Sequence, residues 1–198
     1  MTDLNPQTLP YKDGFILAAL ALLMFATRSD HFGSAISLPD ASLAVFFLAG
    51  YFLNHLSRRL AAFVGLCALA AATDYWAIAH RGVSDFCVTG AYGFLLPAYY
   101  LAWWAGERAP DRPLRHRSAV LTFLALALLA TSGAFLISSG SFYLLAPYFS
   151  DRSLVEFGQR IALYFPRYLG VTLGYLALAM ALHTGLTASG AARAAHND

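Results

Sequence analysis

Six long apolar runs follow one another along the chain, separated by short polar segments. Because a membrane-spanning helix needs about 20 mostly apolar residues, we expect each run to form one helix. The helices are expected at about residues 15–26, 41–56, 60–79, 84–105, 119–137 and 154–186. Asp40 is a suitable N-cap for the second helix, and Gly82 is suited to end the third. The pattern therefore predicts an all-α integral membrane protein, with one domain over residues 1–198 and six transmembrane helices.

The composition supports a membrane protein and excludes several other classes. Hydrophobic residues make up 59% of the chain and charged residues only 12%, whereas about a quarter of the residues in a soluble domain are charged. Two cysteines cannot form the framework of a disulfide-rich secreted protein. The net charge of +2 gives no indication of nucleic-acid binding. Lys12 is the only lysine and no glycine-rich loop precedes it, so we expect no ATP site in this chain.

The distribution of basic residues predicts the orientation in the bilayer. With six spans, both termini share a side with the second-to-third and fourth-to-fifth connections. That side carries eight basic residues, and the other side carries three, which are Arg28, Arg81 and Arg152. Since cytoplasmic loops are enriched in Lys and Arg, we expect both termini in the cytoplasm. The other three connections are then extracytoplasmic.

Charged residues at membrane depth gather in the outer half of the predicted bundle. Asp74 lies about six residues before the outer end of the third helix, roughly 9 Å below the surface. Arg160 lies in the first turns of the sixth helix. Because charged side chains are costly in lipid, we expect both to face the protein interior, where they can pair. Asp74 can instead hydrogen-bond locally near Thr73. These positions predict a pocket that opens away from the cytoplasm.

The two cysteines have different predicted roles. Cys67 lies in the middle of the third helix, where a free cysteine behaves as a small apolar residue. Cys87 lies at the expected N-terminus of the fourth helix, where the helix dipole lowers a thiol pKa and favours the thiolate that binds soft metals. Their depths differ by roughly 20 Å, which excludes a disulfide. His31 and His80, in the outer loops, are alternative ligands.

Three stretches of the sequence resemble a known family. The first contains His-Phe-Gly-Ser at 31–34, Leu-Pro-Asp-Ala-Ser at 38–42 and Phe-Phe-Leu-Ala-Gly at 46–50. The others are Thr-Asp-Tyr-Trp at 73–76 and Ser-Asp-Phe-Cys-Val-Thr-Gly-Ala-Tyr at 84–92. They look like segments of the BtuM family, small solitary cobalamin transporters of Gram-negative bacteria that are similar to the S-components of energy-coupling factor (ECF) transporters. The chain length and helix count match throughout, whereas the motifs cover only the first four helices.

The resemblance implies an S-component-like bundle in the bacterial inner membrane, with a pocket for cobalamin or cobinamide that faces the periplasm. It implies that Cys87 ligates the cobalt from the lower axial side, which leaves the ligand base-off and favours reductive loss of a bound cyanide. Asp74, Tyr92 and Arg160 match further residues of the family's site, and His31 is a weaker match. Aromatic side chains suit the corrin ring, and the candidates are Tyr75, Trp76, Tyr92 and Tyr143.

Docking to an ECF coupling module is less well supported by the sequence. The resemblance implies docking through small residues spaced by four on the first helix. Three alanines there, Ala18, Ala19 and Ala21, are followed four residues later by larger side chains, Leu22, Leu23 and Phe25. They form no pair of small residues. We therefore expect a protein that works alone or with an atypical partner.

Two other functions stay open. Cys87, Arg160 and His183 occur in the order found in exosortase-like membrane transpeptidases, although we expect His183 near the inner face and Cys87 near the outer face. A b-type cytochrome subunit needs two facing histidines at similar depth, and His55 with His183 is the candidate pair.

Overall fold

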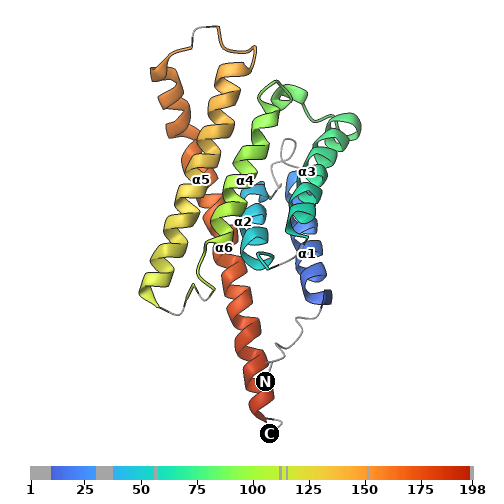
Figure 1. The fold of residues 1–198 in the computed structure, drawn as a ribbon. Helices are drawn as coiled ribbons and strands as arrows, with labels where there is room; N and C mark the ends of the chain where they lie inside the picture. The colour runs from blue at the N-terminus through green and yellow to red at the C-terminus, as the bar shows by residue number, and fades with distance from the viewer. Residues whose placement is uncertain are drawn as a thin grey trace.

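The computed structural model describes residues 10–29, 38–55, 58–111, 113–114, 116–150 and 152–196, and its long elements are all helices (Figure 1). The α-helices are α1 (Pro10–Arg28), α2 (Ser42–Phe52), α3 (Arg59–Arg81), α4 (Leu95–Glu107), α5 (Arg117–Leu145) and α6 (Leu154–His196). Two short 3-10 helices, η1 (Asp85–Cys87) and η2 (Tyr92–Phe94), precede α4. The predicted all-α class and the six predicted helices are confirmed.

The helices form a bundle whose two ends differ. In Figure 1, α1 begins and α6 ends at the lower end, which also holds the basic connection between α4 and α5. The upper end holds the end of α3, the 3-10 helices and the connection between α5 and α6. We call these the inner end and the outer end, following the orientation that the basic residues predict.

Three helices are long and apolar enough to cross a membrane: α3, α5 and residues 154–187 of α6. In contrast, α2 and α4 have 11 and 13 residues, which gives them lengths of about 17 and 20 Å. The hydrocarbon core of a bilayer is about 30 Å thick. The structure thus supports a membrane protein, while crossing by all six helices stays a prediction.

The start of α4 differs most from the prediction, which placed it at residue 84 instead of Leu95. The intervening segment forms η1 and η2 because its side chains compete with helical backbone bonding. The hydroxyls of Ser84 and Thr89 each accept a hydrogen bond, at 3.2 Å, from the backbone N–H two residues later. This irregular segment carries Cys87 at the outer end of the bundle.

Two predicted helix boundaries agree closely with the structure. Gly82 follows α3 in the left-handed conformation, with φ 66°, which a glycine adopts without steric cost. Asp40 Oδ1 accepts hydrogen bonds from the backbone N–H and the hydroxyl of Ser42, at 3.0 and 2.6 Å. The Asp40 side chain therefore satisfies the first amide of α2, although Ala41 occupies the N-cap position.

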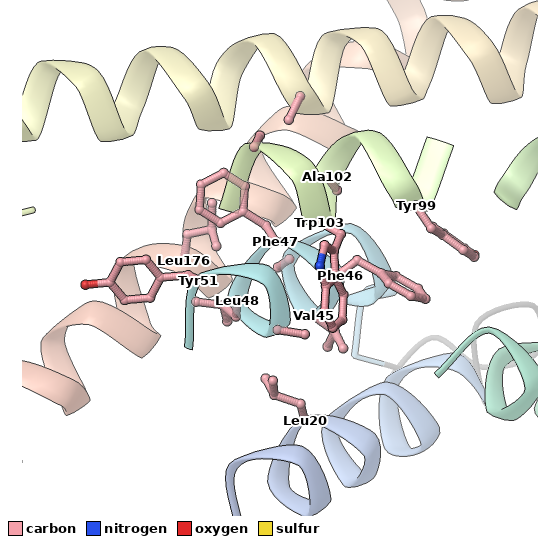
Figure 2. Close-up of a cluster of buried hydrophobic side chains, with 14 of the residues drawn as sticks. Leu20, Val45, Phe46, Phe47, Leu48, Tyr51, Tyr99, Ala102, Trp103 and Leu176 are labelled. Atoms are coloured by element: carbon pink, nitrogen blue, oxygen red, sulfur yellow. The ribbon is translucent and has the colours of Figure 1, made fainter. Parts of the chain in front are cut away.

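The apolar core is built around α2 (Figure 2). Nine of its 11 residues are buried, as expected of a helix that is apolar on all sides and surrounded by others. Phe46 stacks on Tyr99 of α4, with ring centroids 4.3 Å apart. Leu20 of α1 and Leu176 of α6 complete the cluster from the opposite sides.

Two glycines bring the backbones of α2 and α4 into direct contact. A Cβ atom added to Gly50 would overlap the backbone of Trp103, and one added to Gly106 would overlap the backbone of Phe47. Only glycine permits such an approach. This contact fixes the position of α4, whose outer end leads to the candidate site.

The first helix carries a pair of small residues that the alanine spacing did not reveal. Gly14 and Ala18 are spaced by four, and both are exposed on α1. A Cβ atom on Gly14 would meet nothing within 4 Å. The expectation that α1 lacks such a pair is therefore wrong. The spacing of small residues on α1 gives no reason to exclude a helical partner.

Candidate functional site

A cavity of about 310 Å³ lies at the outer end of the bundle, between η1, η2, α5 and α6. We call it the aromatic cavity, because most of its lining residues are Phe or Tyr. Its volume is at the lower end of the range for small-molecule pockets. The lining includes four residues singled out from the sequence: Cys87, Tyr92, Tyr143 and Arg160.

Ring contacts hold the walls of the aromatic cavity together. Phe86 of η1 stacks on Tyr148, from the connection between α5 and α6, at a centroid distance of 4.1 Å. Phe86 also contacts Phe142 of α5 at 5.4 Å. Tyr143 of α5 stacks on Phe157 of α6 at 5.3 Å. The segment that carries Cys87 is thereby attached to the α5–α6 pair.

Cys87 is the last residue of η1 and is exposed in the aromatic cavity. The prediction that it lies at the N-terminus of a helix is wrong, because α4 begins only at Leu95. Partial burial raises the pKa of the Cys87 thiol above its ordinary value of 9.0, the Asp74 carboxylate raises it further, and Arg28 lowers it. This environment therefore favours the thiol over the thiolate, and Cys87 must lose a proton to act as a thiolate ligand.

Asp74 is paired with Arg28 of α1. Arg28 Nε donates to Asp74 Oδ1 and Arg28 Nη2 donates to Asp74 Oδ2, both at 2.6 Å. The arginine side chain is 9% exposed and the aspartate 16%. A bidentate pair of this kind fixes both side chains and is among the stronger hydrogen-bonded arrangements. It joins the outer halves of α1 and α3.

Other polar groups complete what we call the Arg28 cluster: Arg28, Asp40, Ser42, Asp74, Tyr92 and Tyr99. Arg28 Nη1 donates to Tyr99 Oη at 2.9 Å, to Ser42 Oγ at 3.0 Å and to Asp40 Oδ2 at 3.4 Å. Tyr92 Oη donates to Asp74 Oδ2 at 2.7 Å. Since Tyr92 also lines the aromatic cavity, it links the cavity to the cluster.

A smaller cavity of about 120 Å³ adjoins the aromatic cavity, and we call it the polar side pocket. Leu95, Ser138 and Tyr168 line both cavities. The remaining lining comes mainly from the Arg28 cluster, through Arg28, Asp40, Ser42, Asp74 and Tyr99. The site thus consists of a large aromatic compartment and a small charged one.

The predicted pairing of Asp74 with Arg160 is wrong. Arg160 Nε donates instead to Glu156 Oε1, one turn earlier on α6, at 3.2 Å. Its guanidinium carbon lies 4.4 Å from the ring centroid of Phe149, in a cation–π contact. The prediction that both charges face the protein is correct, since Asp74 lines the polar side pocket and Arg160 the aromatic cavity.

Tyr75 and Trp76 do not line either cavity, contrary to the prediction. Tyr75 is 74% exposed, while Trp76 packs against Phe25 of α1 and His80. Successive residues of an α-helix point about 100° apart. Three consecutive residues that include Asp74 therefore cannot all face one pocket.

The histidine alternatives for the ligand are not supported by the described residues. His80 is exposed and its Nδ1 lies 3.3 Å from the carbonyl oxygen of Trp76, away from the two cavities. His31 lies outside the described residues. Within the described part of the chain, no group of three or more His, Cys, Asp or Glu side chains could hold a metal ion.

Arg28 is the central residue of the site that the sequence did not single out. Its signal was its position, directly after the first apolar run and on the outer side, where Asp74 needs a counter-charge. Tyr168 is the other omission. It lies within the apolar pattern of α6, which gives no hint that its side chain lines both cavities of the site.

The three residues of the transpeptidase alternative are not brought together. Cys87 and Arg160 share the aromatic cavity, but His183 follows Arg160 by 23 residues on α6, which corresponds to about 34 Å along a helix. The His183 ring packs against Phe52 at 5.2 Å. His55 Nε2 lies 3.3 Å from Asp13 Oδ1. Both histidines make these contacts in the inner half of the bundle, so His183 forms no transpeptidase site with Cys87.

No protein-family model matches the chain, and no curated protein shows significant sequence similarity to it. The relation to BtuM proteins rests on the motifs quoted above and is therefore a proposal.

Proposed function

We propose that the protein is a transporter of the bacterial inner membrane that binds cobalamin or cobinamide from the periplasm and takes it up. The observation that carries this proposal is the position of Cys87, whose thiol is exposed in an aromatic cavity. Tyr92 and Arg160, two other matches to the BtuM site, line the same cavity although Arg160 is distant in sequence. The agreement between motif positions and cavity lining supports the proposal.

The chemistry of the cavity suits a corrin. A corrin has broad apolar faces, which pack well against Phe and Tyr rings. A thiolate is a soft, strong donor to a transition metal, so Cys87 would bind the cobalt of the substrate and replace the nucleotide base. A cavity of about 310 Å³ does not enclose a whole cobalamin. The lower face of the ring would lie against Cys87, and the rest of the ligand would extend beyond the outer end.

We infer that such ligation also favours decyanation of cyanocobalamin. A thiolate on the lower face donates electron density to cobalt and weakens the bond to the cyanide on the upper face. One electron from an external thiol reductant converts Co(III) to Co(II), and the cyanide leaves as an anion. In this step, Cys87 binds and tunes the cobalt and is not itself consumed.

Titration calorimetry on the purified chain in detergent tests the proposal. Cyanocobalamin should give a saturable heat, and the bound ligand should show a visible spectrum with a sulfur-to-cobalt charge-transfer band. Absence of binding in a folded sample would contradict the proposed function. An absorption spectrum typical of haem in the purified protein would instead support a cytochrome.

The two cysteines provide a matched pair of variants. Cys87→Ser should abolish the charge-transfer band and any decyanation, while contacts to the corrin rim preserve part of the affinity. Cys67→Ser should leave the bound spectrum unchanged, because Cys67 lies in the middle of α3 and lines neither cavity. If Cys87→Ser leaves the spectrum unchanged, the sulfur is not the ligand.

A further inference from the structure

The polar side pocket carries more negative than positive charge. Among the described residues, its lining contains one arginine, Arg28, and two carboxylates, Asp40 and Asp74. Both oxygens of Asp74 already accept hydrogen bonds, from Arg28 and from Tyr92. The negative charge that Arg28 does not neutralise therefore lies mainly on Asp40, whose side chain is 25% exposed.

Asp40 has an oxygen that can accept another hydrogen bond. Its Oδ1 accepts two short bonds from Ser42, at 3.0 and 2.6 Å. From the residues that the structure describes, its Oδ2 accepts one long bond, of 3.4 Å, from Arg28 Nη1. A carboxylate oxygen has two lone pairs, so Oδ2 is available to an N–H donor that enters the pocket.

Tyr168 supplies a donor in the same pocket. Its ring packs against Phe135 at 5.1 Å, and its side chain lines both the polar side pocket and the aromatic cavity. Its hydroxyl makes no hydrogen bond to any residue that the structure describes. A phenol hydroxyl can donate one hydrogen bond, which suits a carbonyl oxygen.

We propose that the polar side pocket is an amide-selective subsite, in which Asp40 accepts a hydrogen bond from the NH₂ of a ligand carboxamide and Tyr168 donates to its carbonyl oxygen. This proposal rests on the proposed function, because the amide would be one of the three free propionamide arms of the corrin. The pocket volume of about 120 Å³ is many times the roughly 10–15 Å³ that a single water needs. The pocket shares Leu95, Ser138 and Tyr168 with the aromatic cavity, so an arm of a corrin bound there would lie next to it.

The subsite should reject a carboxylate at the same position. A carboxylate has no N–H to offer Asp40, and its negative charge meets a cluster that already has an excess of negative charge. Arg167 does not line the polar side pocket; it lines a separate small cavity, to which Asp40 and Tyr168 also contribute. It is exposed, so solvent and salt screen its field. It does not convert the pocket into an anion site.

The test compares cyanocobalamin with its three monocarboxylic acids, in each of which one propionamide arm is hydrolysed to propionate. With the full-length chain in detergent, at least one acid should bind more weakly than cyanocobalamin by a factor of roughly ten, the loss expected for one hydrogen bond to a charged group. In Asp40→Asn, that difference should fall to less than about threefold. Asn can still accept the hydrogen bonds from Ser42, so the start of α2 should be preserved.

Two further variants complete the design. Tyr168→Phe removes only the donor, so it should weaken cyanocobalamin binding several-fold while changing the affinity of the discriminated acid less. Asp13→Asn removes a carboxylate that faces His55 at the inner end, and it should leave the discrimination unchanged. All variants are compared by thermal unfolding to show that they are folded.

The possible outcomes separate the subsite from the proposed function. If cyanocobalamin binds and all three acids bind equally well, the subsite is wrong and the proposed function stands. If an acid is discriminated equally in the wild type and in Asp40→Asn, another group is responsible and the subsite is wrong. If neither cyanocobalamin nor cobinamide binds to the folded wild-type chain, the proposed function fails and the subsite fails with it.

Discussion

Arg28 and Asp74 form a bidentate ion pair, with two hydrogen bonds of 2.6 Å, that joins α1 to α3 and lines the polar side pocket. The same arginine also donates to Tyr99 of α4 and to Ser42 of α2. One buried side chain therefore connects four helices at the outer end.

Replacement of Arg28 should be among the most damaging substitutions in the protein. Arg28→Ala leaves the Asp74 carboxylate buried without its counter-charge, which costs about 3–5 kcal/mol. The double variant Arg28→Met, Asp74→Leu should recover part of that loss, because neither charge is then left unpaired. Thermal unfolding in detergent measures both.

Arg160→Ala is the matched control for this prediction. Arg160 is 39% exposed, and its partner Glu156 lies one turn away on the same helix. Such a pair, together with a cation–π contact, contributes about 1 kcal/mol or less. If Arg28→Ala proves as mild as Arg160→Ala, the Arg28 cluster does not hold the helices together.

The contact between α2 and α4 gives a second prediction. Gly50→Ala or Gly106→Ala adds a methyl group that overlaps the backbone of the facing helix, so the helices must separate. Overpacking of this kind costs about 1–3 kcal/mol or more. Gly170→Ala is the control, because its Cβ would meet nothing within 4 Å, and alanine is favoured over glycine in a helix by up to about 1 kcal/mol. Equal effects at Gly50 and Gly170 would contradict the close approach.

The sequence predicted the number and order of helices because their apolar runs are long and interrupted by turn residues. Gly82 marked the end of α3 correctly. The start of α4 could not be found in this way, since residues 84–94 are apolar enough for a helix. Backbone hydrogen bonds to the hydroxyls of Ser84 and Thr89 instead favour the two short 3-10 helices η1 and η2.

The sequence predicted the depth of the site residues in the membrane but not which charged residues pair with each other. Cys87 and Arg160 were placed near the outer surface, and both reach one cavity. Depth alone does not say which face of a helix a residue occupies, so Asp74 was assigned to Arg160 when its partner is Arg28. The angular spacing of a helix does exclude Tyr75 and Trp76 from the face of Asp74, and this information was present in the sequence.

The junction between α5 and α6 depends on the hydroxyl of Tyr143. That oxygen accepts a hydrogen bond from the backbone N–H of Ser153 at 2.8 Å and lies 3.0 Å from Glu156 Oε2. Tyr143 is itself buried, and Tyr143→Phe removes these hydrogen bonds, so it should lower stability by about 1 kcal/mol. Tyr148→Phe, at a residue that is 49% exposed, should have little effect. Similar losses in both variants would show that the Tyr143 hydroxyl is not the cause.

The reactivity of Cys87 reports the electrostatics of the site directly. In a Cys67→Ser background, Cys87 is the only thiol of the chain. Burial and the Asp74 carboxylate raise its pKa above 9.0, so the thiolate fraction at pH 7 is below that of an ordinary cysteine. Alkylation by iodoacetamide should therefore be slow at pH 7 and should still be accelerating as the pH passes 9. The observed rate against pH gives the midpoint.

Removal of the carboxylate beside Cys87 should move that midpoint downward. In Asp74→Asn, the negative charge that disfavours the thiolate is lost while Arg28, which favours it, remains. Alkylation at pH 8 should then be faster than in the Cys67→Ser parent. Glu156→Gln is the control, because Glu156 pairs with Arg160 and is not among the groups that shift the Cys87 pKa. A midpoint below pH 8 in the parent would mean that Cys87 is stabilised as a thiolate, as a position at a helix N-terminus would predict, and would contradict the placement of Cys87 in η1 beside Asp74.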